Sequence, residues 1–596
     1  MKYTYFVMNY AKFGLVTLLP ILLMAQSPKT PFHREAYFLN SGNHDGATEP
    51  GAQARLAFKD VIRIPGASWL RLVFNSYHLA DLYTPPVSNL DSVDISADPT
   101  SSYILMTSLE DGATQRLDAT SISQWRNSSA FFNGEAIEIE LHVAPGDRGI
   151  FFETKEVMAG IPQVQTDARM SKSTAIQEIC GTDDRVPSTD AAIGRTVQVV
   201  SGDSLAWCTG WIASNGAHLT AGHCAQPTSD LVVLEFNVRA SDADGTPNFS
   251  HPDSQYSVIA SSIVSDDDVG FNHFGKDWAV FDCYSNSNTG LLPVEAQLAF
   301  YRMSIDSDPS TLRITGYGDA AGSLNKTQQT ATASAVADDE NYDSANDVYW
   351  ILQVDVKDGV SGGPIIVNGT NLTIGVLTDG ACQTFDHFQN YGTGFENNEF
   401  EAAIQNFPGA NITYADAGHD IATEDGTVFR PYDTIGEAVS AAAAGETISV
   451  VTGYYNEAVT ISKAITFHIP VGGITIGASG PSASVQQFAD AEAEEVEETD
   501  PALPSVYALH NAYPNPFNPT ATIRYDLPEP AEVRLVIYNL LGREVVRLAE
   551  GHMAPGYHAA LWHGRDATGR PVPSGLYIAR LVTPKYVKSI KMILLK

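Results

Sequence analysis

The chain has 596 residues, which is too long for one hydrophobic core and predicts several domains of roughly 100 to 200 residues each. Its composition is that of a globular protein, with 44% hydrophobic and 18% charged residues, but 70 acidic residues outnumber 35 basic ones. This acidic balance argues against nucleic acid as a partner and favours a soluble, secreted protein.

Residues 1–25 predict a signal peptide that is removed on export. Lys2 and Lys12 precede an apolar run over residues 13–24, and the small Ala25 follows it. The run is short for a membrane span, and no later segment approaches about 20 uninterrupted apolar residues. We therefore expect no transmembrane segment in the mature chain; an uncleaved amino-terminal anchor is the alternative.

Residues 26–160 predict an amino-terminal β-sandwich, because short runs alternate apolar and polar residues between turn residues. The part from Ser102 to Gly134 loosely resembles CUB modules. The domain is a propeptide, a folding chaperone or a substrate-recruiting module, and the sequence does not choose among these roles. A polar linker is expected over residues 161–178. The expected strands span residues 69–74, 102–106, 135–143 and 149–152.

The five cysteines all lie between residues 180 and 382, which predicts one disulfide-stapled domain over residues 179–407. Cys208 and Cys224 bracket a predicted hairpin, and a disulfide across a loop of that size stabilises by about 3 kcal/mol. Cys180 could reach Cys382, which would leave Cys283 as a buried thiol. A bridge from Cys180 to Cys283 is the alternative.

The segment "CTGWIASNGAHLTAGHC" ends on His223, which an apolar strand delivers between Gly222 and Cys224. Further along, "GKDWAVFDC" places Asp277 at the beginning of another apolar strand. A carboxylate at a buried strand edge can accept the Nδ1 proton of a histidine, fix its tautomer and stabilise the imidazolium. The sequence therefore predicts that Asp277 orients His223.

Other aspartates compete with Asp277 for this role. Asp282 lies at an odd offset from Asp277, so on one extended strand the two side chains point to opposite faces. The run from Asp266 to Asp268 is expected to be a solvated loop. Neither alternative is favoured.

The segment "GVSGGP" supplies a candidate nucleophile, Ser361. Flanking glycines let backbone N–H groups converge on a developing oxyanion. The N–H groups of Gly359 and Ser361 are the predicted oxyanion hole.

The segments "TAGHC", "KDWAVF" and "GVSGGP", in this order, resemble trypsin-like serine proteases. The resemblance implies two six-stranded antiparallel barrels with the active site between them. It also implies hydrolysis through an acyl-enzyme, with His223 as general base and then acid, Asp277 as its orienter and Ser361 as nucleophile. The texts "CGTDDRV" and "CTGWIAS" resemble the bacterial glutamyl endopeptidase branch in particular.

Three positions bear on activation and specificity. Many relatives have aspartate before the nucleophile, where this chain has Val360, and the Ile-Val-Gly-Gly start that a freed amino terminus would present is missing. Activation by a buried ammonium–aspartate pair is therefore not expected. Leu377, beside Thr378 in the expected pocket wall, stands where a glutamate-selecting protease would have histidine. Asp355 stands where proteases specific for Arg or Lys keep a carboxylate, although the bacterial branch has aspartate there without that specificity.

No metal or cofactor is predicted. The segment from Ser241 to Asn248 contains an Asp-x-Asp-Gly fragment, but the closing glutamate of a calcium loop is missing, which favours a plain turn. No His/Cys cluster has zinc spacing, and no glycine-rich loop followed by lysine suggests a nucleotide.

The carboxy-terminal third is expected to contain three further parts. Residues 408–480 resemble the opening coil of right-handed parallel β-helix proteins and predict a short spacer, with a helix over residues 432–444 and strands over 447–451, 458–461 and 464–469. Residues 481–507 are small and acidic and predict a linker. Residues 508–596 resemble the sorting domains of the type IX secretion system of Gram-negative bacteria, as an Ig-like β-sandwich.

The sequence thus predicts a mainly β, multidomain, secreted serine endopeptidase without a cofactor. Its expected partners are protein or peptide substrates and the type IX secretion machinery, and its expected route runs through the periplasm and outer membrane to the cell surface or medium. The alternative is a catalytically inactive, surface-displayed binding or adhesion protein on a protease scaffold. A polysaccharide-cleaving enzyme built on residues 411–480 is a third possibility.

Overall fold

The computed structural model divides into two compact units, Met1–Ala491 and Glu492–Lys596. As predicted, the fold is mainly β. The described residues are 29–48, 54–80, 101–162, 183–201, 203–267, 275–305, 309–337, 349–382, 388–419, 423–470, 474–477, 507–509, 521–539, 543–553, 556–562, 564–565, 570, 572–573 and 575–594. The predicted signal peptide and most of the two predicted linkers lie outside them.

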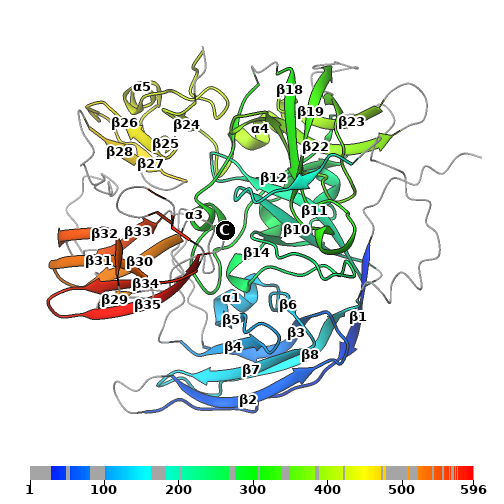
Figure 1. Cartoon of the computed structure of the whole chain (residues 1–596), viewed down its shortest axis with the longest axis vertical. Helices are drawn as coiled ribbons and strands as arrows, with labels where there is room; N and C mark the ends of the chain where they lie inside the picture. The colour runs from blue at the N-terminus through cyan, green and yellow to red at the C-terminus, as the bar shows by residue number, and fades with distance from the viewer. Residues whose placement is uncertain are drawn as a thin grey trace, which may run out of the picture. The chain divides into compact units, whose positions relative to one another are not determined.

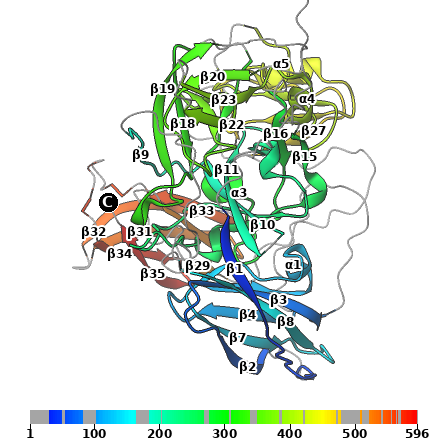
Figure 2. The ribbon, with the colours of Figure 1, turned by 90° about the vertical axis from the view of Figure 1, so that its right-hand side faces the viewer.

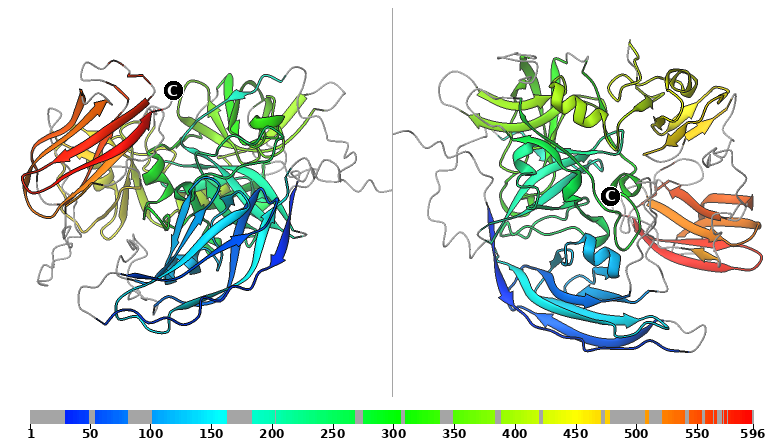
Figure 3. Two further views of the ribbon diagram at one scale, coloured as in Figure 1. Left: turned by 60° about the horizontal axis from the view of Figure 1, so that its bottom comes forward. Right: turned by 180° about the vertical axis from the view of Figure 1, so that it is seen from behind.

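Two antiparallel sheets form the amino-terminal part of the first unit (Figure 1). One has the strand order β2-β7-β4-β5, and the other contains β1-β8-β3-β6. Figure 3 shows these strands as a curved layer. The strands predicted near residues 69, 102 and 135 are β3, β4 and β7, whereas the run at 149–152 covers only the beginning of β8. The bounds are β1 (Thr30–Ala36), β2 (Arg55–Arg63), β3 (Trp69–His78), β4 (Tyr103–Ser108), β5 (Thr114–Leu117), α1 (Ala119–Gln124), β6 (Phe132–Asn133), β7 (Ala136–Val143) and β8 (Phe151–Gly160).

The amino-terminal sheets continue directly into the next part of the chain. Strand β1 pairs with β8 along most of its length, and its first residues pair with β11 (Ser204–Ile212), as Figure 2 shows. One hydrophobic cluster contains side chains of both parts; those from beyond the amino-terminal sheets are Val197, Leu205, Trp207, Val232, Val233 and Phe249. The two parts therefore share one core.

Two aromatic rings at this junction stack on each other. The Phe131 and Phe249 rings are parallel, with centroids 4.2 Å apart. The side chain of Asn133 exchanges two hydrogen bonds with the backbone of Phe249, at 2.9 and 3.0 Å. In the same way, the Gln255 side chain accepts from the Phe131 N–H at 2.9 Å and donates to its carbonyl at 2.8 Å. Each part thus satisfies buried backbone groups of the other, which an apolar contact alone would leave unpaired.

The first of two barrels follows. Strands β14-β13-β10-β11-β12-β16 pair antiparallel in this order, and a bridge from Val258 to Cys283 joins the two ends of the row. Strand β15 pairs with β16 outside the ring. The remaining bounds are β10 (Ile193–Val200), β12 (His218–Thr220), η1 (Gly222–Cys224), β13 (Leu231–Glu235), η2 (Pro252–Ser254), β14 (Gln255–Ser257), η3 (Ala260–Ser262), β15 (Val264–Asp267) and β16 (Asp277–Phe281).

The second barrel closes fully. Strands β18-β19-β20-β23-β22-β21 pair antiparallel in this order, and β21 pairs back to β18. The expectation of two six-stranded antiparallel barrels is confirmed. The bounds are β9 (Val186–Pro187), α3 (Pro293–Gln297), β17 (Arg302–Met303), β18 (Thr311–Gly316), η4 (Gly322–Leu324), β19 (Gln329–Ala337), β20 (Tyr349–Gln353), β21 (Pro364–Val367), β22 (Leu372–Cys382), β23 (Phe388–Gly394) and α4 (Asn398–Gln405).

A small parallel module completes the first unit. Strands β24-β25-β27 and the pair β26-β28 are parallel, as expected of a β-helix coil. The expected strand at residues 458–461 is wrong, because that stretch forms no strand. Tyr414 and Phe429 belong to the same hydrophobic cluster as the barrels, and the Asp416 carboxylate binds the Arg302 guanidinium at 2.6 and 2.8 Å. The bounds are β24 (Ile412–Ala415), α5 (Ile435–Ala441), β25 (Thr447–Val450), β26 (Gly453–Tyr455), β27 (Thr466–His468) and β28 (Ile474–Ile476).

The second unit is a β-sandwich. Its two sheets have the strand orders β29-β30-β33 and β32-β31-β34-β35, and both supply side chains to one hydrophobic core. Among the described residues of the chain, no helix is long and apolar enough to cross a membrane. The bounds are β29 (Ala508–Leu509), β30 (Ala521–Leu527), β31 (Ala531–Asn539), β32 (Glu544–Met553), β33 (Gly556–Trp562), β34 (Gly575–Val582) and β35 (Val587–Leu594).

The shared core predicts that the amino-terminal sheets and the first barrel unfold together. Phe131→Ala removes a fully buried ring and its stack on Phe249, and we expect a loss of about 3–5 kcal/mol in the free energy of unfolding. Calorimetry together with tryptophan fluorescence measures it. Phe152→Ala is the matched control, because Phe152 packs against Phe58 and Phe74 within the amino-terminal sheets. Both variants should lower the midpoint of the same unfolding transition. Two unfolding transitions, each lowered by only one of the variants, would contradict a common core.

Candidate active site

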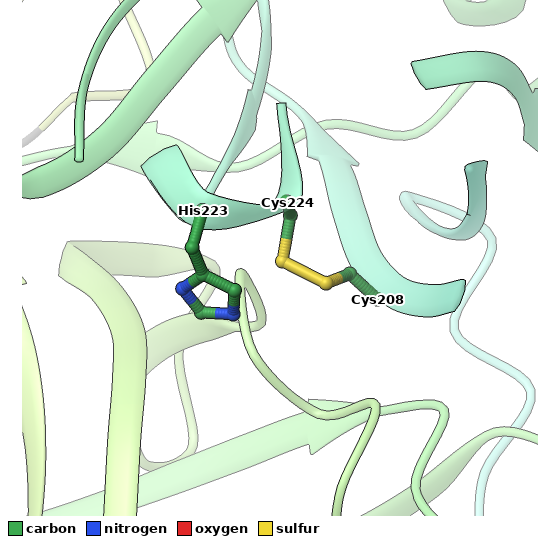
Figure 4. A group of neighbouring side chains, drawn as sticks. All are labelled: Cys208, His223 and Cys224. Atoms are coloured by element: carbon green, nitrogen blue, oxygen red, sulfur yellow. A yellow bond between two sulfur atoms is a disulfide. The ribbon is translucent and has the colours of Figure 1, made fainter. Parts of the chain in front are cut away.

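His223 lies in η1, directly after β12. The disulfide between Cys208 and Cys224, predicted from the sequence, ties η1 to β11 (Figure 4). A Cβ at Gly222 would lie 1.8 Å from the Asp266 carbonyl oxygen, so only glycine allows β15 to approach this turn. The backbone before and after His223 is therefore fixed on both sides, while its imidazole is about one third exposed.

Asp277 holds His223 through two hydrogen bonds. Its Oδ2 lies 2.7 Å from Nδ1 of the imidazole, and its Oδ1 accepts from the His223 N–H at 2.8 Å. The Asp277 side chain is buried, at 5% exposure. Thr393 donates its hydroxyl to the Asp277 carbonyl at 3.1 Å. With Nδ1 bonded to a carboxylate, that nitrogen carries the proton and Nε2 is left as the basic nitrogen.

The competing aspartates were Asp282 and the run from Asp266 to Asp268. Asp282 faces His218 instead, with its Oδ1 4.0 Å from Nδ1 of that ring. Asp266 and Asp267 belong to β15 and pair with β16, so the expected loop is wrong for them, although Asp267 is exposed to solvent. Asp268 lies outside the described residues.

The loop that carries Ser361 packs against β11 and β12, the strands that lead to His223. The Thr209 N–H donates to the Ser361 carbonyl at 2.8 Å. Gly362 has a φ of +86°, and a Cβ there would lie 2.1 Å from the Thr220 hydroxyl oxygen. Only glycine fits at this position. The loop therefore brings the backbone of Ser361 against the disulfide-linked end of the hairpin that carries His223.

The backbone of this loop alternates between bonded and free N–H groups. Val360, Gly362 and Gly363 donate to the carbonyls of Lys357, Leu377 and Val360, respectively. Within the described part of the chain, the N–H groups of Gly359 and Ser361 donate no hydrogen bond. These two are the predicted oxyanion donors, and they remain available to a ligand.

The predicted pocket residues lie around this loop. The Leu377 N–H, on β22, donates to the Gly363 carbonyl at 2.8 Å, and the Leu377 side chain is buried among apolar neighbours. Thr378 donates its hydroxyl to the Tyr391 carbonyl at 3.2 Å. Asp355 is buried, and its Oδ2 accepts from the Asp184 N–H at 3.2 Å. Burial first, and then the Asp355 charge, raise the pKa of the Asp184 carboxyl.

Among the cysteines whose side chains the structure describes, the two next to His223 form a disulfide. Cys208 and Cys224 lie close enough to His223 to form a metal-like cluster, but their sulfurs are bonded to each other. A thiolate, not a disulfide sulfur, binds metal ions. Cys283 is a free, buried thiol, as expected, and burial raises its pKa. The predicted pairing of Cys180 with Cys382 lies outside the described side chains.

A family model of trypsin matches residues 184–392, the two barrels. Residues 184–392 form a trypsin-like serine protease domain. A model of the FlgD Ig-like domain matches residues 517–583, in the second unit. No curated protein matches the chain.

Several solved protease structures resemble this protease domain. The thermostable serine protease AL20 from an extremophilic microorganism is 15% identical, covers 36% of this chain and 99% of its own, and has a TM-score of 0.28. The protease Anisep from Arthrobacter nicotinovorans is 16% identical over 35% of this chain and 93% of its own, with a TM-score of 0.27. An inactivated protease paralogue from the scabies mite is 16% identical over 36% and 93%, with a TM-score of 0.26.

The sequence did not predict two residues that hydrogen-bond to the backbone of the serine loop, Thr209 and Lys326. Thr209 donates its N–H to the Ser361 carbonyl and its hydroxyl to the Gly359 carbonyl at 2.9 Å. Lys326 donates to the Asp358 carbonyl at 2.8 Å. Only the position of Thr209 next to Cys208 hinted at a role, and no motif marks Lys326.

His218, on the strand that leads to His223, is a buried histidine without a strong partner. It is 1% exposed, its Nδ1 lies 3.3 Å from the Phe281 carbonyl, and its Nε2 has no partner among the described residues. Burial lowers its pKa to about 4. Burial also raises the pKa of the neighbouring Asp282 carboxyl to about 6, although that side chain is one third exposed.

His218 therefore predicts a loss of stability in acid. The unfolded chain binds a proton at this histidine below pH 6.5, whereas the folded chain does so only near pH 4, so acidification through this window favours unfolding. His218→Leu should remove about 3 kcal/mol of this loss between pH 7 and pH 4. Denaturant melts at both pH values measure it. Asp282→Asn is the control: because the pKa of Asp282 is raised in the folded chain, its removal should increase the loss of unfolding free energy in acid. Equal pH dependence of the unfolding free energy in His218→Leu and the unchanged protein would contradict the assignment.

Proposed function

We propose that the chain is a secreted serine endopeptidase in which His223, Asp277 and Ser361 form the catalytic triad. The observation that carries the proposal is the 2.7 Å contact between Asp277 and Nδ1 of His223, next to a serine loop with two free N–H groups. A structural histidine would not need a buried carboxylate on one side and an exposed ring edge on the other.

The proposed reaction begins with proton transfer from the Ser361 hydroxyl to Nε2 of His223. The Ser361 oxygen attacks the carbonyl carbon of the substrate peptide bond, and the N–H groups of Gly359 and Ser361 bind the oxyanion. The imidazolium, stabilised by Asp277, then gives its proton to the leaving amine as the C–N bond breaks. Water hydrolyses the acyl-enzyme by the same steps, with His223 as base and then acid.

Leu377 and Asp355 are the residues that bear on the substrate preference of the pocket. The segments near Cys180 and Cys208 support a place within the glutamyl endopeptidase branch, but Leu377 is buried in an apolar cluster and offers no charge for a glutamate. Asp355 already accepts a hydrogen bond from Asp184. Cleavage assays on peptides ending in Arg, Lys, Glu and Phe decide between these options. If the enzyme does not prefer Arg or Lys, Asp355 is not part of the specificity pocket.

The proposed route of export rests on the two ends of the chain. Residues 1–25 have the pattern of a signal peptide, and the segment from residue 508 has the motifs of type IX sorting domains. An Ig-like family match over residues 517–583 supports a separately folded carboxy-terminal domain. The protein would pass through the periplasm and the outer membrane of a Gram-negative bacterium, and the sorting machinery is its proposed partner.

The alternative is an inactive binding or adhesion protein on the same scaffold. A binding protein needs neither the buried carboxylate at His223 nor the free N–H groups of the serine loop. Their joint presence favours the enzyme.

A fluorophosphonate probe tests the proposal, because it reacts only with an activated serine. We expect labelling of the full chain, no labelling of Ser361→Ala, and unchanged labelling of Ser310→Ala, which alters an exposed serine outside the site. Asp277→Asn should lower kcat on a peptide substrate by about 10⁴-fold, because an asparagine in a Ser-His-Asp triad holds the histidine in the wrong tautomer. A folded chain that the probe does not label, or one labelled at another serine, would favour the binding protein.

A further inference from the structure

A buried lysine, Lys326, contacts the backbone of the loop that carries Ser361. Lys326 is 2% exposed, and its ammonium group donates to the Asp358 carbonyl at 2.8 Å. The N–H of Asp319 donates to the same carbonyl at 2.9 Å. The Asp319 carboxylate lies 2.6 Å from the ammonium and balances its charge. Two donors thus hold one carbonyl, and one of them is a cation.

The Asp358 carbonyl shares its peptide plane with the N–H of Gly359. In a trans peptide the C=O and N–H bonds point in opposite directions. Fixing the carbonyl toward Lys326 therefore turns the Gly359 N–H away from Lys326, to the side where it has no partner in the described structure. Gly359 has a φ of +104°, and a Cβ there would lie 2.8 Å from the Lys326 nitrogen. Only glycine leaves room for this contact.

The second oxyanion donor is held in a parallel way. The Val360 carbonyl accepts from the Gly363 N–H at 2.8 Å, which directs the N–H of Ser361 to the opposite side. This bond lies within the loop. The first donor, in contrast, depends on contacts from outside the loop, of which Lys326 supplies the charged one.

Lys326 is itself fixed. Its N–H donates to the Gly318 carbonyl at 3.1 Å, and its carbonyl accepts from the guanidinium of Arg195 at 2.9 Å. Arg195 is fully buried and bound to Glu235 at 2.6 and 2.8 Å. The lysine therefore reaches the loop from a backbone position that the first barrel holds.

The residue before the nucleophile cannot supply this restraint. Val360 is buried and packs with Leu312, Ile314 and Leu377, so no charged pair forms there. Resting on the proposed function, we infer that Lys326 is a positioning residue that sets the Gly359 N–H for the oxyanion. Because Lys326 is internal to the chain, the oxyanion hole forms without a newly freed amino terminus.

Lys326→Met tests this role, since methionine fills similar space without donating a hydrogen bond. Loss of one oxyanion donor lowers kcat by about 10²–10³-fold, so a disturbed donor should lower it by about tenfold to a hundredfold with KM within threefold. Binding of a peptide aldehyde, which forms an oxyanion with Ser361, should weaken by the same factor as kcat. A peptide amide inhibitor that forms no oxyanion should bind unchanged.

Arg313→Met is the matched control. Arg313 is a partly exposed cation in the same barrel that bonds to Tyr301 and Thr315 and does not touch the serine loop. It should keep kcat within about twofold. An unchanged kcat in folded Lys326→Met, or an equal loss in Arg313→Met, overturns the inference.

Two further outcomes are kept apart by the same experiment. Should Lys326→Met fail to fold, Lys326→Gln replaces it: its amide reaches one bond less far, so kcat should fall by about threefold to tenfold, and a full kcat overturns the inference. If the unaltered chain does not react with a fluorophosphonate, the proposed function fails. If it reacts and Lys326→Met reacts equally fast, only the role of Lys326 fails.

Discussion

The burial of the Asp277 carboxylate is the constraint on which the site depends. A charged side chain at 5% exposure loses nearly all of its hydration and needs hydrogen bonds to replace it. It obtains two from His223, one from the backbone and one from the ring, so β16 and η1 cannot move independently. The disulfide from Cys224 to β11 then transmits this placement to Thr209, which holds the serine loop. One buried charge thus aligns three segments that are far apart in the chain.

The protease domain does not stand alone within the first unit. Strand β1 adds to the edge of β11, and Trp207 and Phe249 bury their rings in a cluster that the amino-terminal sheets complete. Removing those sheets would expose both rings and leave the backbone of Phe249 without its Asn133 partners. The parallel module is joined in a similar way, through Tyr414 in a common cluster and the Arg302–Asp416 ion pair.

The sequence predicts the features that depend on neighbouring residues better than those that depend on contacts between residues far apart in the chain. Local signals sufficed for the strand that delivers His223 and for the disulfide at Cys224, whereas the parallel order of the small module was implied by a resemblance to β-helix proteins. The opposite faces of Asp277 and Asp282 followed from the period of a strand. The expected loop at Asp266 is a strand instead, because pairing with β16 overrode its polar composition. The roles of Thr209 and Lys326 depend on contacts across the fold, which no local pattern records.

The buried ion pair of Arg195 and Glu235 lies between Lys326 and the aromatic cluster at the junction with the amino-terminal sheets. A buried ion pair gives little net stability, because desolvation offsets the attraction, and an apolar pair would fill the space as well. An apolar side chain, however, could not donate to the Lys326 carbonyl. Arg195 does so while its guanidinium lies over the Trp207 ring, 4.3 Å from the centroid, and within 5.6 Å of that of Phe249. Since Phe131 stacks on Phe249, the amino-terminal sheets support the same side chains that hold Lys326. A continuous series of contacts thus runs from Phe131 through Phe249, Arg195 and Lys326 to the backbone of the serine loop.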